Sequence, residues 1–542
     1  MNAYYYMRKV QGIMVKGVLP FYLITLLPFI TSCSLDEEPR DQIPEEEAYT
    51  TAQALFQNTV ATLYTYIGGS EEGQGLQGTI RGVYDLQTFG SDEAMLPTRG
   101  GDWYDGGLWR AMYMHTWDAG NEITKNSWLY LYKVITLCNH SLEQLEVHKA
   151  LLDDTAYQEY TAEVRALRAI YYWYLLDLFG NVPVITSTDI SMLQVKQTPR
   201  AEVFRFVVEE LEGCLDYLTY YNSVQPGDYY GRVTHPVAVF VLAKLMLNAE
   251  VYSGTPQWKK TIEYCDELEQ SGFELEEEYF DNFIVHNENS KENIWIIPMD
   301  RDLYTNQQQN MFRSLHYRHA AALGFTGENG TCATKKVLEV FGYGTEHLDE
   351  RFLLNYWADE VYDLNGKIVY DRTGKQLCYY PQAVEINLNG SPYLETAGAR
   401  MLKYEVDKNA TKDGKLMDND IVLFRYADVL LMRAEAKLRL TGSADDASFV
   451  KTAQQDYDDV RSRVFMESRP LTLENLLDER LLELCWEGWR RQDLIRFGQY
   501  ESLFTGDDYD DKIDESDGHT TIFPIPGDVM ALNHNLVQNP GY

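Results

Sequence analysis

YTAEVRALRAIYYWYLLDLFG, residues 160–180, is the clearest helical pattern in this chain. Ala162, Ala166 and Ala169 recur every three or four residues among mostly apolar neighbours, which is the spacing of one helix face. Gly180 then ends the pattern. Because alanine leaves room for a second backbone, the stretch predicts a long helix that packs closely against a neighbouring helix.

Other segments on either side carry related patterns. HPVAVFVLAKLMLNAEVYSG, residues 235–254, has Pro236 in its first turn and stops at Gly254. QWKKTIEYCDELEQSG, residues 257–272, follows as an amphipathic helix, and a similar pair lies within 426–464. These pairs indicate tetratricopeptide-type helix hairpins, in which each following unit covers an exposed face. We therefore expect a mostly α fold built on such hairpins.

Between the helical pairs the composition changes. Residues 270–420 are rich in Tyr, Asn, Gly and Thr, with strand-like pieces such as NIWIIPM at 293–299 and KIVYDRTG at 367–374. This region predicts long loops and short hairpins inserted into the helical scaffold. Residues 81–118 form a second loop-rich zone. Loops of this size usually carry function.

The N-terminus has the pattern of an export signal. Three basic residues precede an apolar run at 18–30, which is too short to span a bilayer comfortably and fits a signal-peptide core. Ile30, two small residues and Cys33 then resemble a bacterial lipobox, in which the cysteine is lipidated and becomes the first residue. The sequence leaves open whether Met1 or Met14 is the start.

These signals define the expected domain organisation. Residues 1–32 are the predicted lipoprotein signal peptide, and 33–45 are a lipidated tether kept extended by its two prolines. Residues 46–542 form the folded domain. Several acyl chains would anchor Cys33 stably, since one alone is marginal.

Charge and cysteine content exclude some partners. Removing 1–32, which carries three positive charges and no negative one, takes the formal charge from −36 to −39, so nucleic acid and anionic lipid are disfavoured. The six cysteines after Cys33 form no CxxC pair, so zinc is not expected. Whether any of them pair stays open, and those in helical patterns are read as buried small residues: Cys138, Cys214, Cys265 and Cys485.

The acidic run GDDYDDKIDESDG, residues 506–518, raises the question of a calcium site. It lacks the spacing and closing Glu of an EF-hand, so a solvated loop is the favoured interpretation. We expect neither a metal nor a cofactor.

Several motifs together resemble the SusD/RagB family of outer-membrane glycan-binding lipoproteins of the Bacteroidetes. The resemblance covers nearly the whole chain. Its motifs are CSLDEEP at 33–39, VRALRAIYYWYLLDLFGNVPVI at 164–185, GRVTHPVAVFVLAKLMLNAEVY at 231–252, ENIWII at 292–297, FRYADVLLMRAEAKL at 424–438, LLDERLLELCWEGWRRQDLIRFG at 476–498 and FPIPGDVMALNHNLVQNPGY at 523–542.

The resemblance implies a SusD-like fold and a non-enzymatic role. Such a protein would be lipid-anchored through Cys33 on the exterior of the outer membrane. It would capture oligosaccharides or polysaccharide and deliver them to a SusC-like TonB-dependent transporter. Capture of peptides or glycopeptides by the same architecture is the alternative. A glycoside hydrolase is the weaker reading, because no stretch singles out a carboxylate pair.

The loop SDEAMLPTRGGDWYDGGLWRAMYMHTW, residues 91–117, is the main candidate for the sugar site. Trp103 and Trp109 offer flat faces on which pyranose rings stack, and Arg99 and Asp102 would exchange hydrogen bonds with hydroxyls. The resemblance also points to aromatic residues of this loop, among them Tyr104. The opposite possibilities are that the two indoles are buried anchors and that Arg99 pairs with Asp102.

A second contribution is expected from residues 300–330, where the resemblance suggests that Tyr304 and Tyr317 contact the glycan. His316 and His319 lie three residues apart in the same segment, but without a further ligand they are read as surface or core histidines. The charged helix pattern at 479–493 indicates buried Arg–Glu pairs between helices rather than catalytic carboxylates.

Overall fold

The computed structural model describes residues 48–500 and 518–542. These residues belong to one compact unit, Ala48–Tyr542. The predicted signal peptide, Cys33 with its tether, and nearly all of the acidic run at 506–518 lie outside the described residues.

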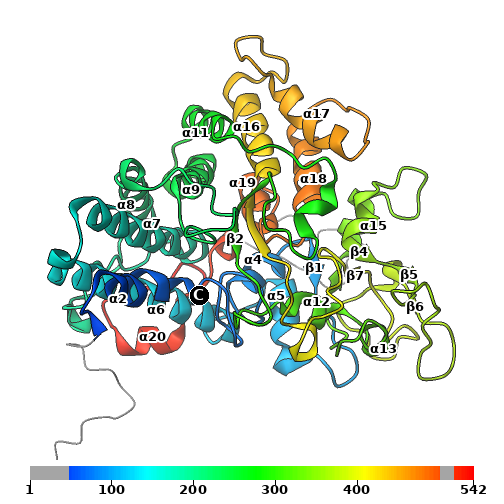
Figure 1. The fold of residues 1–542 in the computed structure, drawn as a ribbon. Coiled ribbons are helices and arrows are strands. Elements are labelled where there is room, and N and C mark those ends of the chain that lie inside the picture. The colour runs from blue at the N-terminus through cyan, green and yellow to red at the C-terminus, as the bar shows by residue number, and fades with distance from the viewer. Residues whose placement is uncertain (1–47, 501–517) are drawn as a thin grey trace, which may run out of the picture. The chain divides into compact units, whose positions relative to one another are not determined.

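The described chain is mostly helical, as predicted (Figure 1). The α-helices are α2 (Ala52–Phe56), α3 (Thr62–Tyr64), α4 (Val83–Thr88), α5 (Leu108–Met114), α6 (Glu122–Val147), α7 (Asp154–Phe179), α8 (Arg200–Glu212), α9 (His235–Leu247), α10 (Ala249–Ser253), α11 (Trp258–Gln270), α12 (Gln309–Ser314), α13 (Tyr317–Ala322), α14 (Lys335–Val340), α15 (Arg351–Asn355), α16 (Tyr426–Thr441), α17 (Ala453–Arg463), α18 (Leu473–Leu484), α19 (Arg490–Arg496) and α20 (Gly527–Leu532).

The strands of the described residues pair only as short antiparallel ribbons. The pairs are β1 (Ala94–Met95) with β3 (Cys332–Ala333), β2 (Asn293–Ile297) with β8 (Ile421–Arg425), β4 (Tyr356–Trp357) with β7 (Arg400–Met401), and β5 (Asp359–Glu360) with β6 (Cys378–Tyr379).

Helix α7 confirms the prediction from residues 160–180. Asp153 caps its N-terminus by accepting a hydrogen bond from the Ala156 N–H, and every residue from Ala166 to Phe179 is buried. Gly180 ends the helix with a φ of 71°, which a residue with a Cβ adopts only with strain. Helix α7 packs against α6 and α8.

The predicted helix pairs are also present. Helix α9 packs on α11, α11 packs on α16, and α16 packs on α17. The expected helix at 235–254 is nevertheless interrupted at Asn248, which divides α9 from α10. The Asn248 amide donates to the Lys244 carbonyl and accepts from Arg496, so a side chain competes with the helical backbone at this point.

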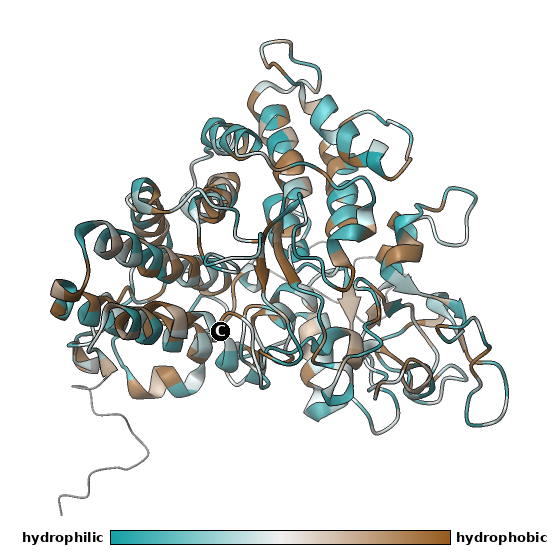
Figure 2. Ribbon diagram, viewed as in Figure 1, coloured by the Kyte–Doolittle hydropathy of each residue, from teal (hydrophilic) through white to brown (hydrophobic). Residues whose placement is uncertain are grey.

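Strands β2 and β8 lie at the centre of the fold, and Figure 2 shows β2 as strongly hydrophobic. Ile297 at the end of β2 pairs with Ile421 at the start of β8. The intervening residues, 298–420, therefore leave and re-enter the helical scaffold at adjacent points. They contain the expected loops and hairpins together with the short helices α12–α15, which the loop-like composition did not predict.

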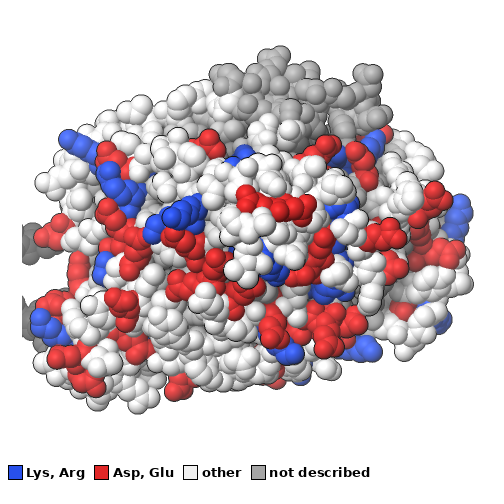
Figure 3. Space-filling model, turned by 90° about the horizontal axis from the view of Figure 1, so that it is seen from above, with Lys and Arg blue, Asp and Glu red and all other residues white. Residues whose placement is uncertain are grey.

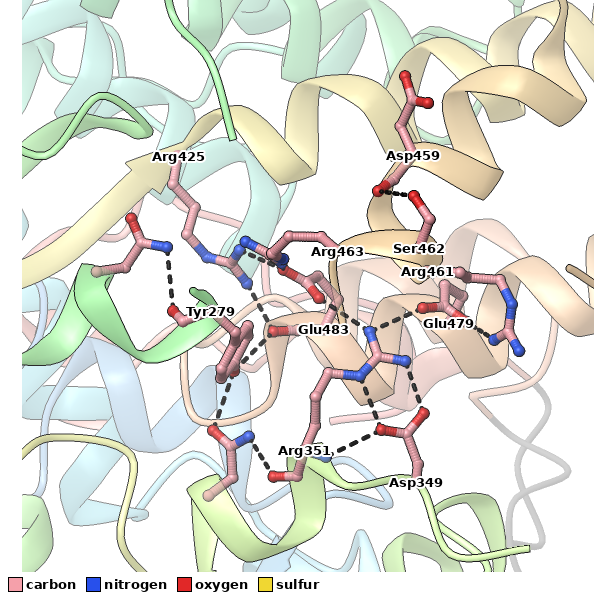
Figure 4. A network of polar contacts seen from close by, with 12 residues as sticks. Tyr279, Asp349, Arg351, Arg425, Asp459, Arg461, Ser462, Arg463, Glu479 and Glu483 are labelled. Atoms are coloured by element: carbon pink, nitrogen blue, oxygen red, sulfur yellow. Dashed lines mark hydrogen bonds and ion pairs between the residues drawn. The ribbon is translucent and has the colours of Figure 1, made fainter. Parts of the chain in front are cut away.

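A buried ionic network joins this segment to the C-terminal helices (Figure 4). Glu483 on α18 is paired with Arg351, Arg425 and Arg463, and Arg351 also binds Glu479 at 2.8 Å. These side chains are almost fully buried. Other charged residues of the core are paired in the same way: Arg480 with Asp428 and Asp493, Glu487 with Lys403 and Arg425, Arg490 with Asp92, Arg491 with Asp177, and Glu435 with Arg496. The structural interpretation of these charges is confirmed. The expectation that the charged residues of 479–493 share one helix is wrong, because α18 ends at Leu484 and α19 begins only at Arg490, with Trp486 at a φ of 66° between them.

The six cysteines of the described residues are free thiols. All are buried except Cys378, which is half-buried, and burial raises the pKa of Cys138 and Cys485 to about 12. The reading of these residues as small core side chains is therefore confirmed. Within 48–500 and 518–542, no helix combines the length and apolar character needed to cross a bilayer.

Candidate functional site

The loop between β1 and α5 has a tightly turned backbone. Arg99 and Asp102 exchange two N–H···O bonds of 3.0 Å, which close a turn at Gly100. Trp103 and Asp105 then have positive φ values of 60° and 40°, in a region that non-glycine residues rarely occupy. Between them Tyr104 points outward: 59% of it is exposed, and its side chain makes no hydrogen bond or ring contact with another described residue.

The two indoles of this loop have different environments. Trp109 is only 1% exposed; its ring packs edge-on against Phe89 and Trp103, and its N–H donates to the Asp105 carboxylate at 2.8 Å. The prediction that Trp109 offers a sugar-stacking face is therefore wrong, because the core covers it. Trp103 is half-buried and donates its N–H to the Glu328 carbonyl at 2.9 Å, which fixes the ring while leaving part of it accessible.

Arg99 and Asp102 do not pair through their side chains. The Arg99 guanidinium is buried and donates to the carbonyl oxygens of Leu394 and Ala397 at 2.9 and 2.8 Å. Burial lowers the pKa of Arg99 to about 9. The prediction that Arg99 contacts a ligand is wrong, since it anchors the loop instead. Asp102 is exposed and accepts a 2.6 Å hydrogen bond from the Tyr317 hydroxyl.

Arg81 lies beside the same loop and was not predicted from the sequence. Its guanidinium bridges Glu72 and Asp105, with 2.8 Å to the latter, and about a fifth of its side chain is exposed. Arg81 itself has a φ of 58°. A single arginine in a glycine-rich segment gave no signal, because its partner Asp105 lies 24 residues away.

Tyr317, at the start of α13, extends this surface to the segment 371–396. The Arg372 guanidinium lies 5.5 Å from the centre of the Tyr317 ring. Burial and the hydrogen bond to Asp102 raise the pKa of Tyr317 to about 12, so it stays a neutral donor. Arg372 also lines a cavity of about 470 Å³.

That cavity is lined by two further tyrosines, Tyr380 and Tyr393. Their ring centres are 4.6 Å apart at an angle of 45°, and they are 43% and 38% exposed. Glu395 and Asp371 supply carboxylates on its wall. We call the residues Asp102, Trp103, Tyr104, Tyr317, Arg372, Tyr380 and Tyr393 the outer surface. The abundance of tyrosine was noticeable in the sequence, but nothing local distinguished Tyr380 and Tyr393.

Tyr304 is not part of the outer surface. It lines a separate cavity together with Phe56 of α2, whereas Tyr317 begins α13. Figure 1 shows α2 and α13 at opposite sides of the fold. The structure thus separates two residues that the sequence analysis expected to serve one site.

His316 and His319 are core residues, which is one of the two alternatives expected from the lack of a further ligand. Both are buried, His316 facing Glu395 at 3.3 Å and His319 contacting the Tyr379 hydroxyl at 3.1 Å. Burial lowers their pKa to about 4 and about 3, so both are neutral near pH 7. Among the described residues there is no group of three or more His, Cys, Asp or Glu side chains placed to hold a metal ion.

The outer surface combines accessible ring faces with fixed polar groups. Asp102 and Arg372 provide an acceptor and a donor next to Tyr317, and the two-tyrosine cavity provides two adjoining rings. Mostly aromatic linings with few oriented polar groups are typical of binding sites for small organic ligands, sugars included.

Comparison with known proteins identifies the family of this chain. The model of the SusD family matches residues 291–542. A second model, described as "Starch-binding associating with outer membrane", matches residues 35–247. Together the two matches cover most of the chain. The chain belongs to the SusD family.

Two relatives illustrate the likeness to other SusD-family proteins. The starch-binding protein SusD of Bacteroides thetaiotaomicron is 25% identical, over 97% of this chain and 99% of the relative. A SusD-like protein of Bacteroides ovatus is 26% identical, over 70% of this chain and 67% of the relative.

Solved structures agree on the SusD-like fold. A laminarin-binding SusD-like protein aligns with a TM-score of 0.69 at 21% identity, over 91% of this chain and all of the other. Surface glycan-binding protein A of Bacteroides thetaiotaomicron, in complex with laminarihexaose, aligns with a TM-score of 0.70 at 20% identity, over 90% of this chain and all of the other.

Proposed function

We propose that this SusD-family chain is a non-catalytic glycan-binding protein of the cell surface. The observation that carries the proposal is the outer surface, where the unpartnered Tyr104 shares a loop with Asp102 and the Tyr380–Tyr393 pair lies beside Arg372. Relatives named as starch-binding and laminarin-binding proteins support this reading.

The residues of the outer surface would have distinct roles. Trp103, Tyr104 and Tyr317 would offer ring faces to pyranose units, and Asp102 would accept hydrogen bonds from their hydroxyls. Arg372 would donate. Trp109 and Arg99 would act only by holding the loop in place.

Delivery and anchoring complete the proposal. Sugar hydroxyls exchange water for protein partners with little net gain, so binding at one site would be weak and reversible. Such binding suits a protein that passes oligosaccharides to a SusC-like TonB-dependent transporter. Lipidation at Cys33 would hold the chain at the outer membrane; the family resemblance and the lipobox pattern support both points.

Affinity electrophoresis tests the proposal. The chain 34–542, which keeps every described residue, is run in gels containing starch, laminarin and other plant, host and microbial polysaccharides. We expect at least one polysaccharide to retard the wild type, and Tyr104→Ala and Tyr380→Ala to reduce the retardation. Tyr217→Ala is the matched control, because Tyr217 is 48% exposed and lies outside both cavities.

The results separate the possibilities. Retardation that both outer-surface variants retain in full would keep the function and reject this location. If no polysaccharide retards the wild type, the proposal that the ligand is a glycan is contradicted. Binding of a peptide or glycopeptide would then be tested by calorimetry. The formal charge of −39 after signal removal, and the acidic side chains across the face in Figure 3, would favour a cationic peptide in that case.

A further inference from the structure

A second cavity, of about 360 Å³, lies between α2, α3, the turn at 228–232 and the loop at 298–306. We call it the α2 cavity. Its size falls within the range of about 300–1,000 Å³ that small-molecule sites occupy. No residue of the outer surface lines it.

The walls of the α2 cavity are mainly aromatic. Phe56 and Tyr64 come from the continuous helical stretch 52–64, and Tyr230 and Tyr304 come from two other chain segments. Leu303 at the rim is 76% exposed, although it is apolar. Apolar side chains from separate segments that converge on an open concavity indicate a binding surface rather than a packing defect.

Most of these walls are rigidly held. The Tyr64 hydroxyl donates to Glu163, and the Tyr230 hydroxyl donates to the buried Asp420. The Arg232 guanidinium stacks 4.9 Å from the centre of the Phe56 ring and is engaged by both oxygens of Glu163. The ring faces therefore stay in place without a ligand, which lowers the entropic cost of binding.

The Asp228 carboxylate and the Tyr304 hydroxyl are among the polar groups of the cavity that have no partner among the described residues. Tyr304 is 41% exposed, and partial burial beside Asp420 raises its pKa, so its hydroxyl stays protonated. One free acceptor and one free donor thus face a cavity with fixed aromatic walls. An anionic ligand is disfavoured, because Glu163 already neutralises Arg232.

We propose that the α2 cavity is a second carbohydrate site, which takes one end or one branch of a neutral oligosaccharide by stacking on Tyr304 and hydrogen bonding to Asp228. This inference rests on the proposed function, since it concerns the same class of ligand. Two separated sites on one chain would let a single polysaccharide bind at two points, and the second binding event would be favoured by a high effective concentration.

Calorimetry with short oligosaccharides tests the inference. The probes are laminarihexaose and a starch-derived oligosaccharide of equal length, added to the chain 34–542. We expect two binding events per wild-type chain and one for Tyr304→Ala or Asp228→Asn. Both residues are exposed and unpartnered, so these variants should fold normally, and Tyr217→Ala serves again as the control. Retardation by the parent polysaccharide should weaken by about tenfold or more in Tyr304→Ala.

The outcomes distinguish this inference from the proposed function. The contrary result is a single binding event in the wild type that is lost in Tyr104→Ala or Tyr380→Ala but unchanged in Tyr304→Ala. That result would overturn the second site and leave the proposed function intact. No binding of any oligosaccharide or polysaccharide to the wild type would overturn both. A crystal structure of the complex with sugar density against Tyr304 would support the inference directly.

Discussion

At the scale of single residues, the most consequential feature is the density of buried charge. Glu483 alone contacts three arginines from three different elements, Arg351, Arg425 and Arg463. Burying such groups is expensive unless each charge keeps its partners. Losing Glu483 would therefore remove one of the carboxylates that neutralise each of these three buried guanidinium groups.

We predict that Glu483→Ala lowers the free energy of unfolding by about 3–5 kcal/mol, the range found when one partner of a buried ion pair is removed. Chemical denaturation monitored by circular dichroism measures the change. Glu209→Ala is the matched control, because Glu209 pairs with Arg205 at the surface with 69% of its side chain exposed. That substitution should change the free energy by less than about 1 kcal/mol. Equal effects of the two would contradict the structural role of the network.

Glu93 is a second buried carboxyl group, and its environment predicts how the stability of the chain depends on pH. It accepts a hydrogen bond from the Trp486 N–H, and its other oxygen has no partner. Burial raises its pKa from 4.5 to about 7, so the folded chain keeps a proton that the unfolded chain releases. Between these two values the folded state binds more protons, and stability falls as the pH rises.

Glu93→Gln removes this titration while keeping the shape of the side chain. We expect the variant to have a higher Tm than the wild type at about pH 8 and a similar Tm at about pH 4, where Glu93 is protonated in both states. Differential scanning calorimetry across this range measures the difference. A Tm difference that does not vary with pH would show that folding does not raise the pKa of Glu93.

At the scale of elements, the loop between β1 and α5 contains two kinds of side chain: some hold the loop against the core, and others face solvent where a ligand can reach them. Trp109 and Arg99 face inward and hold the loop, whereas Tyr104 faces solvent. The composition of residues 91–117 correctly identified an aromatic, glycine-rich loop. Composition alone could not assign the inward and outward positions, because positive φ values at Trp103 and Asp105 break any regular alternation of side chains.

Trp109→Ala is therefore predicted to destabilise the chain by about 3–5 kcal/mol, the usual loss for removing a buried tryptophan. Tyr104→Ala should change stability by no more than about 0.5 kcal/mol, since its side chain is mostly exposed and makes no hydrogen bond or ring contact with a described residue. Thermal unfolding of the two variants side by side measures this. A stable Trp109→Ala would mean that the loop does not depend on this anchor.

The helical elements were predictable because their signals are local. The α7 pattern, the proline at the start of α9 and the glycine after α16 all lie within the segments that they define. The outer surface was only partly predictable, since Asp102 meets Tyr317 across a long sequence separation. Arg81, beside the same loop, likewise meets Asp105 from 24 residues away. The short helices α12–α15 depend on packing within the segment 298–420 and gave no periodic signal.

At the scale of the whole molecule, the strong negative charge distinguishes between cargoes. A neutral glycan makes no net charge interaction with the chain, whereas a cationic peptide would be attracted to it. Raising the salt concentration screens exposed charges beyond about 10 Å at 0.1 M and about 3 Å at 1 M.

We predict that the affinity for the polysaccharide that binds changes less than about twofold between about 0.05 M and about 0.5 M NaCl. Electrophoresis or calorimetry at the two concentrations measures it. A steep loss of affinity with salt would instead indicate a cationic cargo. Lysozyme, a basic protein, serves as a positive control for salt-sensitive attraction to the acidic surface.

The pairing of Ile297 with Ile421 has an evolutionary consequence. The segment between them departs from and returns to the helical scaffold at one place, so its length can change without moving the helices that flank it. The outer-surface residues Tyr317, Arg372, Tyr380 and Tyr393 all belong to that segment. Ligand preference could thus diverge rapidly among descendants by insertion, deletion or exchange of one contiguous stretch, provided that Arg351 keeps its buried partners.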